Sequence, residues 1–439
     1  MILGIGFESP FTVGLIALGL LLLLIFVGVR VVFAAAIVGL FGLVELLGWG
    51  PAAGIVGTIP HSKSSTYALS VLPMFIFIGF LAYHAGMTSA LFDAARKWIG
   101  WVPGGLAVAT VFATAGFAAV SGASTATSAV FSRVAIPEML RYGYDRRLAA
   151  GVVAAGGTLA TLIPPSAIIV IYAIIVEESV GKLLLAGFLP GIVSALIYAG
   201  IIIVWAMVRR DDAPSVGGFT WGERVKSLPG VLPIFIVVFI IISAIYGGWA
   251  TPTEAGALGA AVVFSLAVLR GTKWKEIQGS LMEAAKLTVM IFSLIWGVLI
   301  FVRFLGFSGL PEAFTSWIVS LDVHPMVIMI CILLAYAILG MFMDAIGMLL
   351  LTLPVVYPAV IALGFDSIWF GIIVVKMAEV CLITPPIGLN CFVVNGVRPD
   401  IPLTDVFRGI ALFFVADVLT IAALLAFPEI VTWLPNLIG

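Results

Sequence analysis

Oxygen-bearing side chains occur beside breaks in apolar helices in two separate parts of this sequence. The first group is made of Ser121, Ser124, Thr161 and the backbone near Gly157 and Pro164. The second group is made of Gly340, Asp344, Glu379 and Thr384. Hard cations prefer oxygen ligands, and neither group offers the nitrogen or sulfur ligands that transition metals favour. We therefore predict two sodium sites, one in each group, as the minimum.

A second set of polar groups is suited to a carboxylate. It consists of Ser124, Thr127, Ser166 and Asn390. Ser166 and Asn390 follow the proline pairs Pro164-Pro165 and Pro385-Pro386, and each pair must unwind a helical turn because proline removes a backbone donor and clashes with the preceding turn. The half-helix that begins after such a break presents free N–H groups and a positive dipole end to an anion. These residues are predicted to bind a small organic anion.

One lysine lies close to these groups in the sequence. Lys376 precedes Glu379 by three residues, so the two side chains share a helix face and are expected to pair. An alternative function uses the same residues differently. Lys376, Glu379 and Asp344 would be the relay of a proton-conducting membrane subunit of a respiratory complex, although such a relay needs more ionisable residues than the sequence supplies.

The composition requires that these groups lie inside a membrane. Of the 439 residues, 63% are hydrophobic and 10% are charged, and the mean hydropathy is +1.26. Soluble domains contain about 25% charged residues, so this chain needs the lipid bilayer as its solvent. A net charge of −1 excludes nucleic acid as a partner. Sodium is the only cofactor expected, and no enzymatic motif is present.

The positioning elements recur along the chain. Gly143-Tyr144-Asp145 returns as Gly364-Phe365-Asp366, and Pro164-Pro165 returns as Pro385-Pro386, both at an offset of 221 residues. The hydroxyl-rich stretch around Ser121 separates two apolar runs that are too short to cross a bilayer, which is typical of a re-entrant hairpin. Its repeat partner is the glycine-flanked Asp344, inside another apolar run. Basic residues place equivalent elements in opposite directions.

These observations predict an all-α integral membrane protein with two inverted repeats. Each repeat has about five spans, one re-entrant helical hairpin and one helix broken at mid-membrane. The predicted segments are scaffold helices in residues 1–101 and 231–322, a cytoplasmic linker in 209–230, and transport-domain halves in 102–208 and 323–439. Within the transport-domain halves, the hairpins are 105–137 and 325–358, and the broken helices are 148–175 and 368–395. Both termini are predicted to be periplasmic.

At these motifs the sequence resembles the large membrane subunit of tripartite ATP-independent periplasmic (TRAP) transporters, the dicarboxylate-permease large-subunit family. The motifs are Ser121-Gly122-Ala123-Ser124, Leu162-Ile163-Pro164-Pro165-Ser166, Ala250-Thr251-Pro252-Thr253-Glu254-Ala255, Gly340-Met341-Phe342-Met343-Asp344, and the segment from Glu379 through Thr384-Pro385-Pro386 to Asn390. Lys376-Met377 departs from the family pattern, in which uncharged polar residues are expected.

The resemblance implies an elevator-type ion transporter fold in the bacterial inner membrane. It also implies sodium-driven uptake of an organic anion, such as a C4-dicarboxylate or a sialic acid. The implied partners are a small four-helix membrane subunit and a periplasmic substrate-binding protein.

Overall fold

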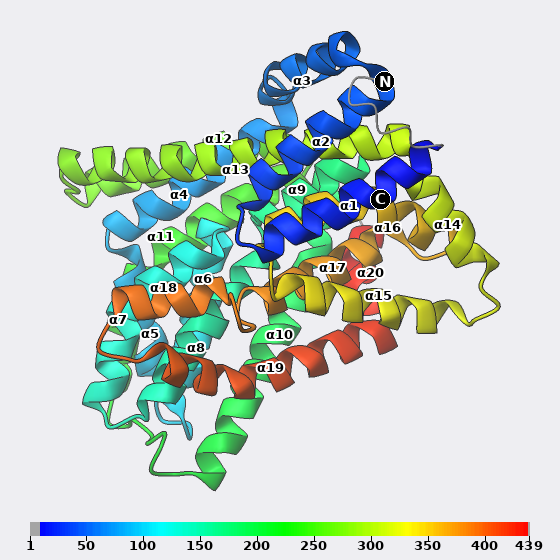
Figure 1. Cartoon of the computed structure of the whole chain (residues 1–439). Coiled ribbons are helices and arrows are strands. Elements are labelled where there is room, and N and C mark those ends of the chain that lie inside the picture. The colour runs from blue at the N-terminus through cyan, green and yellow to red at the C-terminus, as the bar shows by residue number, and fades with distance from the viewer. Residues whose placement is uncertain (1–8, 438–439) are drawn as a thin grey trace.

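The computed structural model describes residues 9–437, and every regular element within them is helical (Figure 1). The elements of the first half are α1 (Pro10–Phe26), α2 (Val31–Leu47), α3 (Trp49–Ser64), η1 (Tyr67–Ser70), α4 (Val71–His84), α5 (Met87–Ile99), α6 (Gly105–Ser121), α7 (Ser124–Arg141), α8 (Arg146–Thr158), η2 (Leu159–Thr161), α9 (Ala167–Val176) and α10 (Val180–Val208). The elements of the second half are α11 (Trp221–Tyr246), α12 (Pro252–Leu269), α13 (Trp274–Ser308), α14 (Leu310–Ser320), α15 (Pro325–Gly340), α16 (Ala345–Ala362), α17 (Ser367–Cys381), α18 (Leu389–Val397), α19 (Leu403–Ala426) and α20 (Glu429–Asn436).

The two halves repeat the same order of elements. In the second half, the three helices α11–α13 lead into the short helix α14 and the hairpin α15–α16. In the first half, α1, α2 and α4 lead into the short helix α5 and the hairpin α6–α7, with α3 and η1 as additional elements between α2 and α4. A broken helix follows, α8–α9 or α17–α18, and then a long helix, α10 or α19. The all-α architecture with two repeats, two hairpins and two broken helices is thereby confirmed.

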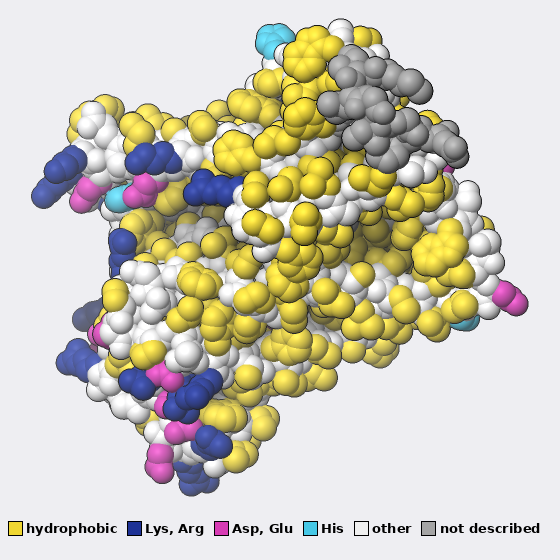
Figure 2. Space-filling view, viewed as in Figure 1, with side chains coloured by type: hydrophobic (Ala, Val, Ile, Leu, Met, Phe, Trp, Pro, Cys, Tyr) yellow, Lys and Arg dark blue, Asp and Glu magenta, His cyan; other side chains and the backbone are white. Residues whose placement is uncertain are grey.

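Seven helices between residues 9 and 437 are long and apolar enough to span a membrane, among them α10, α11, α13 and α19. Large apolar side chains such as Phe33 and Phe239 are exposed on the outside of the helices, as expected where lipid is the solvent. In Figure 2, Lys and Arg side chains gather toward the left and lower left of the molecule, and the rest of the visible face is mostly apolar.

Three local features differ from the sequence prediction. Helix α3 was not anticipated, because Pro60 and four polar residues near its end obscure its pattern. In the sequence, the apolar run that starts at Tyr67 predicts one span through Leu91, but Gly86 adopts a left-handed backbone (φ +71°) and separates α4 from the amphipathic α5. The expected linker is helical from Trp221 onward, where Thr220 and Glu223 form a capping box.

The long helices of both halves pack on each other. α13 packs against α2 and α4, α12 packs against α4 and α11, and α5 packs against α11. The hairpins and broken helices form a second body, in which α8 packs against α6, α7 and α19 and α17 packs against α10 and α15. Contacts between α4 and α6 and between α13 and α16 join the two bodies.

The contact between α8 and α19 depends on glycine. A Cβ atom on Gly409 would lie 1.9 Å from the carbonyl oxygen of Arg147, and one on Gly151 would lie 2.5 Å from the carbonyl carbon of Gly409. At the end of the same seam, Asp405 of α19 pairs with Arg146 at 2.7 Å and with Arg147 at 3.3 Å. The backbones of the two halves therefore touch directly between α8 and α19.

Replacing Gly409 by valine should destabilise the protein, because its side chain would meet backbone atoms that cannot move aside. Overpacking of this kind typically costs about 1–3 kcal/mol. The midpoint of thermal unfolding in detergent should fall for Gly409→Val. It should not fall for Gly200→Val on α10, where an added Cβ has no neighbour within 4 Å. Equal midpoints for the two variants would contradict the close contact.

Candidate substrate and ion site

Each hairpin tip lies against the break in the broken helix of its own half. Gly122, between α6 and α7, has a left-handed backbone (φ +56°), and a Cβ atom there would lie 2.3 Å from the carbonyl oxygen of Pro165. A Cβ atom on Gly340, at the end of α15, would overlap the Cys381 side chain at the end of α17. Glycine at these two positions therefore allows the tips to reach the breaks, which both contain cis Pro–Pro peptide bonds.

Backbone carbonyls freed at the breaks have local partners. The Ser166 hydroxyl donates to the carbonyl oxygen of Thr161, and the Thr384 hydroxyl donates to that of Val380 at 2.7 Å. The backbone N–H of Asn390 donates to the carbonyl oxygen of Leu382 at 2.9 Å. The hydroxyls selected from the sequence therefore stabilise the unwound turns.

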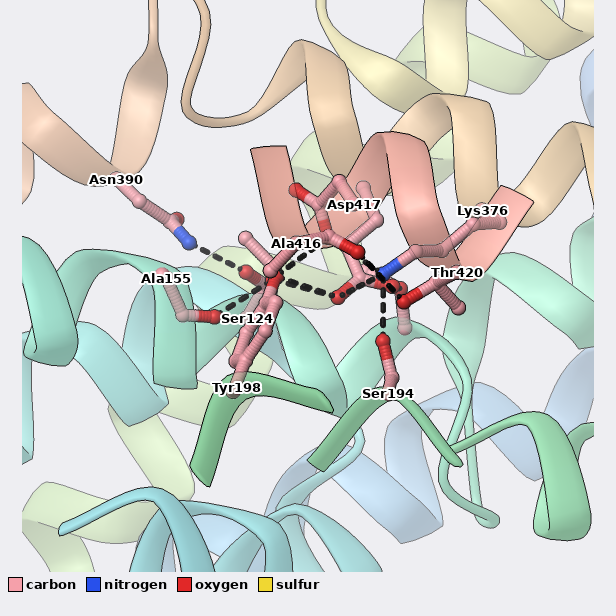
Figure 3. Close-up of polar contacts among 12 residues, drawn as sticks. Ser124, Ala155, Ser194, Tyr198, Lys376, Asn390, Ala416, Asp417 and Thr420 are labelled. Carbon is pink, nitrogen blue, oxygen red and sulfur yellow. Dashed lines mark hydrogen bonds and ion pairs between the residues drawn. The ribbon is translucent and has the colours of Figure 1, made fainter. Parts of the chain in front are cut away.

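Two members of the first predicted sodium group, Ser124 and Gly157, lie in a seam between α7, α8 and α18. A Cβ atom on Gly157 would lie 1.9 Å from Ser128 Oγ and 3.1 Å from the carbonyl oxygen of Ser124. Asn390 Nδ2 donates to Ser124 Oγ at 2.8 Å (Figure 3) and to the carbonyl oxygen of Ala154 at 3.1 Å. Asn390, predicted to bind substrate, thus joins the second half to the hairpin of the first.

Two oxygen atoms in this seam are buried without a hydrogen-bond partner among the described residues, namely Ser128 Oγ and Asn390 Oδ1. Buried polar atoms are nearly always satisfied, so an orphaned pair indicates a place for a ligand. The donor set consists of hydroxyl, amide and carbonyl oxygens, and it fits a hard cation such as sodium. Ser121 lies at the rim of this group, where its Oγ is 3.1 Å from Thr127 Oγ1.

The second hairpin places its carboxylate at a helix start. Asp344 is the N-cap of α16, and its Oδ2 accepts the backbone N–H of Gly347 at 2.9 Å. The carboxylate is half-buried, and its other oxygen makes no hydrogen bond within residues 9–437. Asp344 can therefore cap the helix and still offer one oxygen to a cation.

The two breaks differ in exposure. Pro164, Pro165 and Ser166 are buried, whereas Pro385, Pro386 and Ile387 are exposed. The second break is therefore open at the surface of the chain, whereas the first is enclosed by its neighbours. Of the predicted substrate ligands, Ser166 is fully buried and bonded to Thr161 and Ile169.

Glu379 does not lie with Asp344 in the structure, although the sequence grouped them. Its Oε1 accepts from Thr158 Oγ1 at 2.7 Å, and its Oε2 lies 3.4 Å from Thr161 Oγ1, both on the broken helix of the first half. Lys376 Nζ lies 3.1 Å from Glu379 Oε1, as the sequence predicted. Glu379 thus belongs to a polar network between the halves, beside Thr161 of the first sodium group.

That network also holds a carboxylate that sequence reasoning missed. Lys376 donates to Asp417 Oδ1 at 2.7 Å and to Ser194 Oγ at 2.6 Å, and Tyr198 donates to Asp417 Oδ1 at 2.6 Å (Figure 3). Lys376, Glu379 and Asp417 are all fully buried. Asp417 stands alone in the apolar run of α19, and the rule that intramembrane carboxylates are functional or paired would have found it.

The network connects four helices. Lys376 and Glu379 come from α17, Asp417 from α19, Ser194 and Tyr198 from α10, and Thr158 from α8. One lysine and two carboxylates leave a formal charge of −1, so Lys376 offsets only part of the negative charge. Its ammonium group is therefore essential to the electrostatic balance of this region.

Known proteins resemble the chain over most of its length. The family model "Tripartite ATP-independent periplasmic transporter, DctM component" matches residues 18–430. The C4-dicarboxylate TRAP transporter large permease protein DctM of Pseudomonas aeruginosa is 36% identical over 380 residues, covering 86% of this chain and 88% of the relative. The protein of the same name from Vibrio cholerae is 32% identical over 445 residues, covering 95% and 97%.

A solved structure has the same fold. The YdaH transporter of Alcanivorax borkumensis superposes with a TM-score of 0.59, covering 89% of this chain and 91% of that one, at 15% sequence identity. At this identity the similarity concerns the fold alone.

Replacing Lys376 by methionine should strongly destabilise the protein, because it leaves two carboxylates buried without a cation. Removing one partner of a buried ion pair costs about 3–5 kcal/mol. The thermal unfolding midpoint of Lys376→Met should fall, and adding Asp417→Asn to that variant should restore part of the loss. Lys182→Met, at an exposed site on α10, serves as the control. If adding Asp417→Asn lowered the unfolding midpoint of Lys376→Met further, the idea that Lys376 offsets the charge of the buried carboxylates would be contradicted.

Proposed function

Because the chain belongs to the DctM-component family of tripartite ATP-independent periplasmic transporters, we propose that it is the permease through which a sodium gradient drives the uptake of a small organic carboxylate. The relatives are transporter permeases, so the chain is a transport protein and not an enzyme. The alternative of a respiratory-complex subunit is not supported by these matches.

The sodium part of the proposal is supported by the two oxygens in the seam between α7, α8 and α18 that lack a partner within residues 9–437. Ser128 Oγ and Asn390 Oδ1 are buried and unpartnered among the described residues, and the carbonyl oxygen of Ser124 faces Gly157 beside them. A monovalent cation bound there would tie α7 to α8 and α18. Since Asn390 belongs to the second half, occupation of the seam would also fix the position of the break at Pro385-Pro386.

The second ion would be held at the other hairpin tip. Asp344 offers a carboxylate oxygen, Thr384 a hydroxyl, and Gly340 brings the tip against α17. An unpaired carboxylate inside a membrane is costly, and the ion offsets that cost in the loaded state. Glu379 lies outside this group, so its proposed role is to support Thr161 and the first group.

The cargo would bind between the two ions at the exposed second break. Ser124, Thr127 and Asn390 border the seam, and the positive dipole end of α18 lies at this break and favours a carboxylate. The two relatives described above are named for C4-dicarboxylates. We extend only their shared chemistry to this chain, that of a small organic anion with one or more carboxylates.

Movement would follow an elevator mechanism. The long helices α1, α2, α4 and α11–α13 form the scaffold, and the hairpins and broken helices form the moving body. The two bodies are in close backbone contact at Gly79 of α4, where an added Cβ would lie 2.6 Å from Ser121 Cα. Because glycine has no side chain, nothing on α4 at this point would obstruct sliding. The protein is proposed to lie in the inner membrane with periplasmic termini, and to act with a small four-helix membrane subunit and a periplasmic binding protein.

Uptake should require sodium and no ATP. We expect accumulation of the cargo in proteoliposomes that contain this chain, its small membrane subunit and its binding protein when sodium is supplied outside. Replacing external sodium by choline, with a proton gradient maintained, should abolish accumulation. Unchanged uptake in choline would refute the sodium coupling, whatever the cargo.

Asp344→Asn should weaken sodium binding while the fold is kept, because asparagine still caps α16 but carries no charge. The half-saturating sodium concentration should rise about ten- to hundredfold, which corresponds to ~1.4–2.8 kcal/mol. Thr384→Val should act in the same direction but less strongly, and Thr161→Val should affect the first group instead.

The matched control is Asp366→Asn, which removes a charge from the N-cap of α17, where Asp366 accepts the N–H of Trp369 at 2.7 Å. Sodium-dependent thermal stabilisation of the purified protein provides a second measurement that needs no transport. A wild-type sodium dependence in Asp344→Asn would show that the site is assigned incorrectly.

A further inference from the structure

A large cavity lies between the scaffold and the proposed moving body. It has a volume of about 770 Å³ and is bordered by α3, α9, α13 and α16. Its polar lining includes Lys63 and Ser62 of α3, Arg303 of α13, Glu177 after α9 and Tyr357 of α16. Binding sites for small molecules typically measure about 300–1,000 Å³, so the cavity is large enough for a small organic anion.

The charged side chains of the lining favour an anion. Lys63 and Arg303 contribute two positive charges and Glu177 one negative charge, which leaves a net charge of +1. Glu177 follows α9 with a left-handed backbone (φ +60°), a conformation that is uncommon for residues other than glycine.

Arg303 is in an unexpected place for a membrane protein. Basic residues concentrate at the cytoplasmic ends of spans, and α13 begins beside such residues, Lys273 and Lys275. Arg303 lies 29 residues beyond Trp274, or about 43 Å along the helix at 1.5 Å per residue, and therefore at the opposite membrane face. Because the Arg303 side chain is exposed at that face, we expect it to have a role other than setting the orientation of the chain in the membrane.

Two helices of the proposed moving body, α9 and α16, run between the cavity and the candidate site. Their later turns line the cavity, from Ile171 and from Leu350 onward, and their N-caps are Ser166 and Asp344. These are the first break and the second hairpin tip. An anion that enters beside Arg303 could follow α9 and α16 toward the polar residues at mid-membrane. A guanidinium group also binds a carboxylate through two parallel hydrogen bonds.

We propose that Arg303 and Lys63 form an outer vestibule that binds the carboxylate of the cargo before it reaches the hairpin tips. This assignment rests on the proposed function for the identity of the anion. Because α9 and α16 belong to the moving body, the vestibule would exist in its present form only while that body stands as it does here.

The test measures the local charge without requiring transport. Gly306 lines the cavity one helical turn from Arg303, and an added Cβ there has no neighbour within 4 Å. The variant Gly306→Cys is made in a background where the exposed Cys331 is replaced by serine. The rates at which an anionic and a cationic methanethiosulfonate reagent modify the new cysteine are then measured in proteoliposomes. We expect Arg303→Gln to lower the anionic-to-cationic rate ratio about fivefold, since one nearby charge acts on the two reagents with opposite sign.

Three further measurements make the result decisive. Arg303→Lys should keep the ratio, and Lys286→Gln, on the same helix but outside the cavity lining, should not change it. If Gly306→Cys does not fold, Thr58→Cys on α3 reports on the same cavity. A ratio that Arg303→Gln leaves unchanged would overturn the proposal, as would a reporter that neither reagent reaches because lipid headgroups fill the cavity. Neither outcome would bear on sodium coupling, which the choline experiment tests separately.

Discussion

The peptide groups freed at the two helix breaks must find partners inside the protein, because lipid offers none. This constraint explains the arrangement around them. The hydroxyls of Ser166 and Thr384 accompany the unwound turns, and the glycines at the hairpin tips allow a second backbone to cover each break. Broken helices can exist at this depth only with hairpins beside them, so the ion and substrate groups follow from how the breaks are stabilised.

The two halves of the protein are joined by polar contacts that cross the repeat. Asn390 of the second half donates to Ser124 and Ala154 of the first, and Glu379 accepts from Thr158. Lys376 pairs with Glu379, with Asp417 and Ser194 as its other partners. In this arrangement, a cation bound at the proposed group of one half would act on residues from the other. That coupling is what a transporter needs if its cargo and its ions are to move together.

Charge is distributed in two different ways in this molecule. The buried network carries a formal charge of −1 beside the proposed ion groups, whereas the cavity at the end of α13 carries a net charge of +1 beside the proposed path of the anion. Cations would therefore be favoured deep in the protein and an anion nearer its surface. The apolar lining between them, from α9 and α16, separates these two regions.

The sequence by itself determined the membrane class, the repeat and the positions of the breaks. Apolar runs, proline pairs and glycine-flanked polar residues act locally, and they leave little choice of backbone in lipid. It also indicated the pairing of Lys376 with Glu379, which is a matter of spacing on one helix. Only the tertiary structure decided that Glu379 faces Thr158 and Thr161 instead of Asp344, that Asp417 completes the network, and that Arg303 lines a cavity. These depend on how helices far apart in the sequence pack and rotate against each other, and no local pattern encodes that geometry.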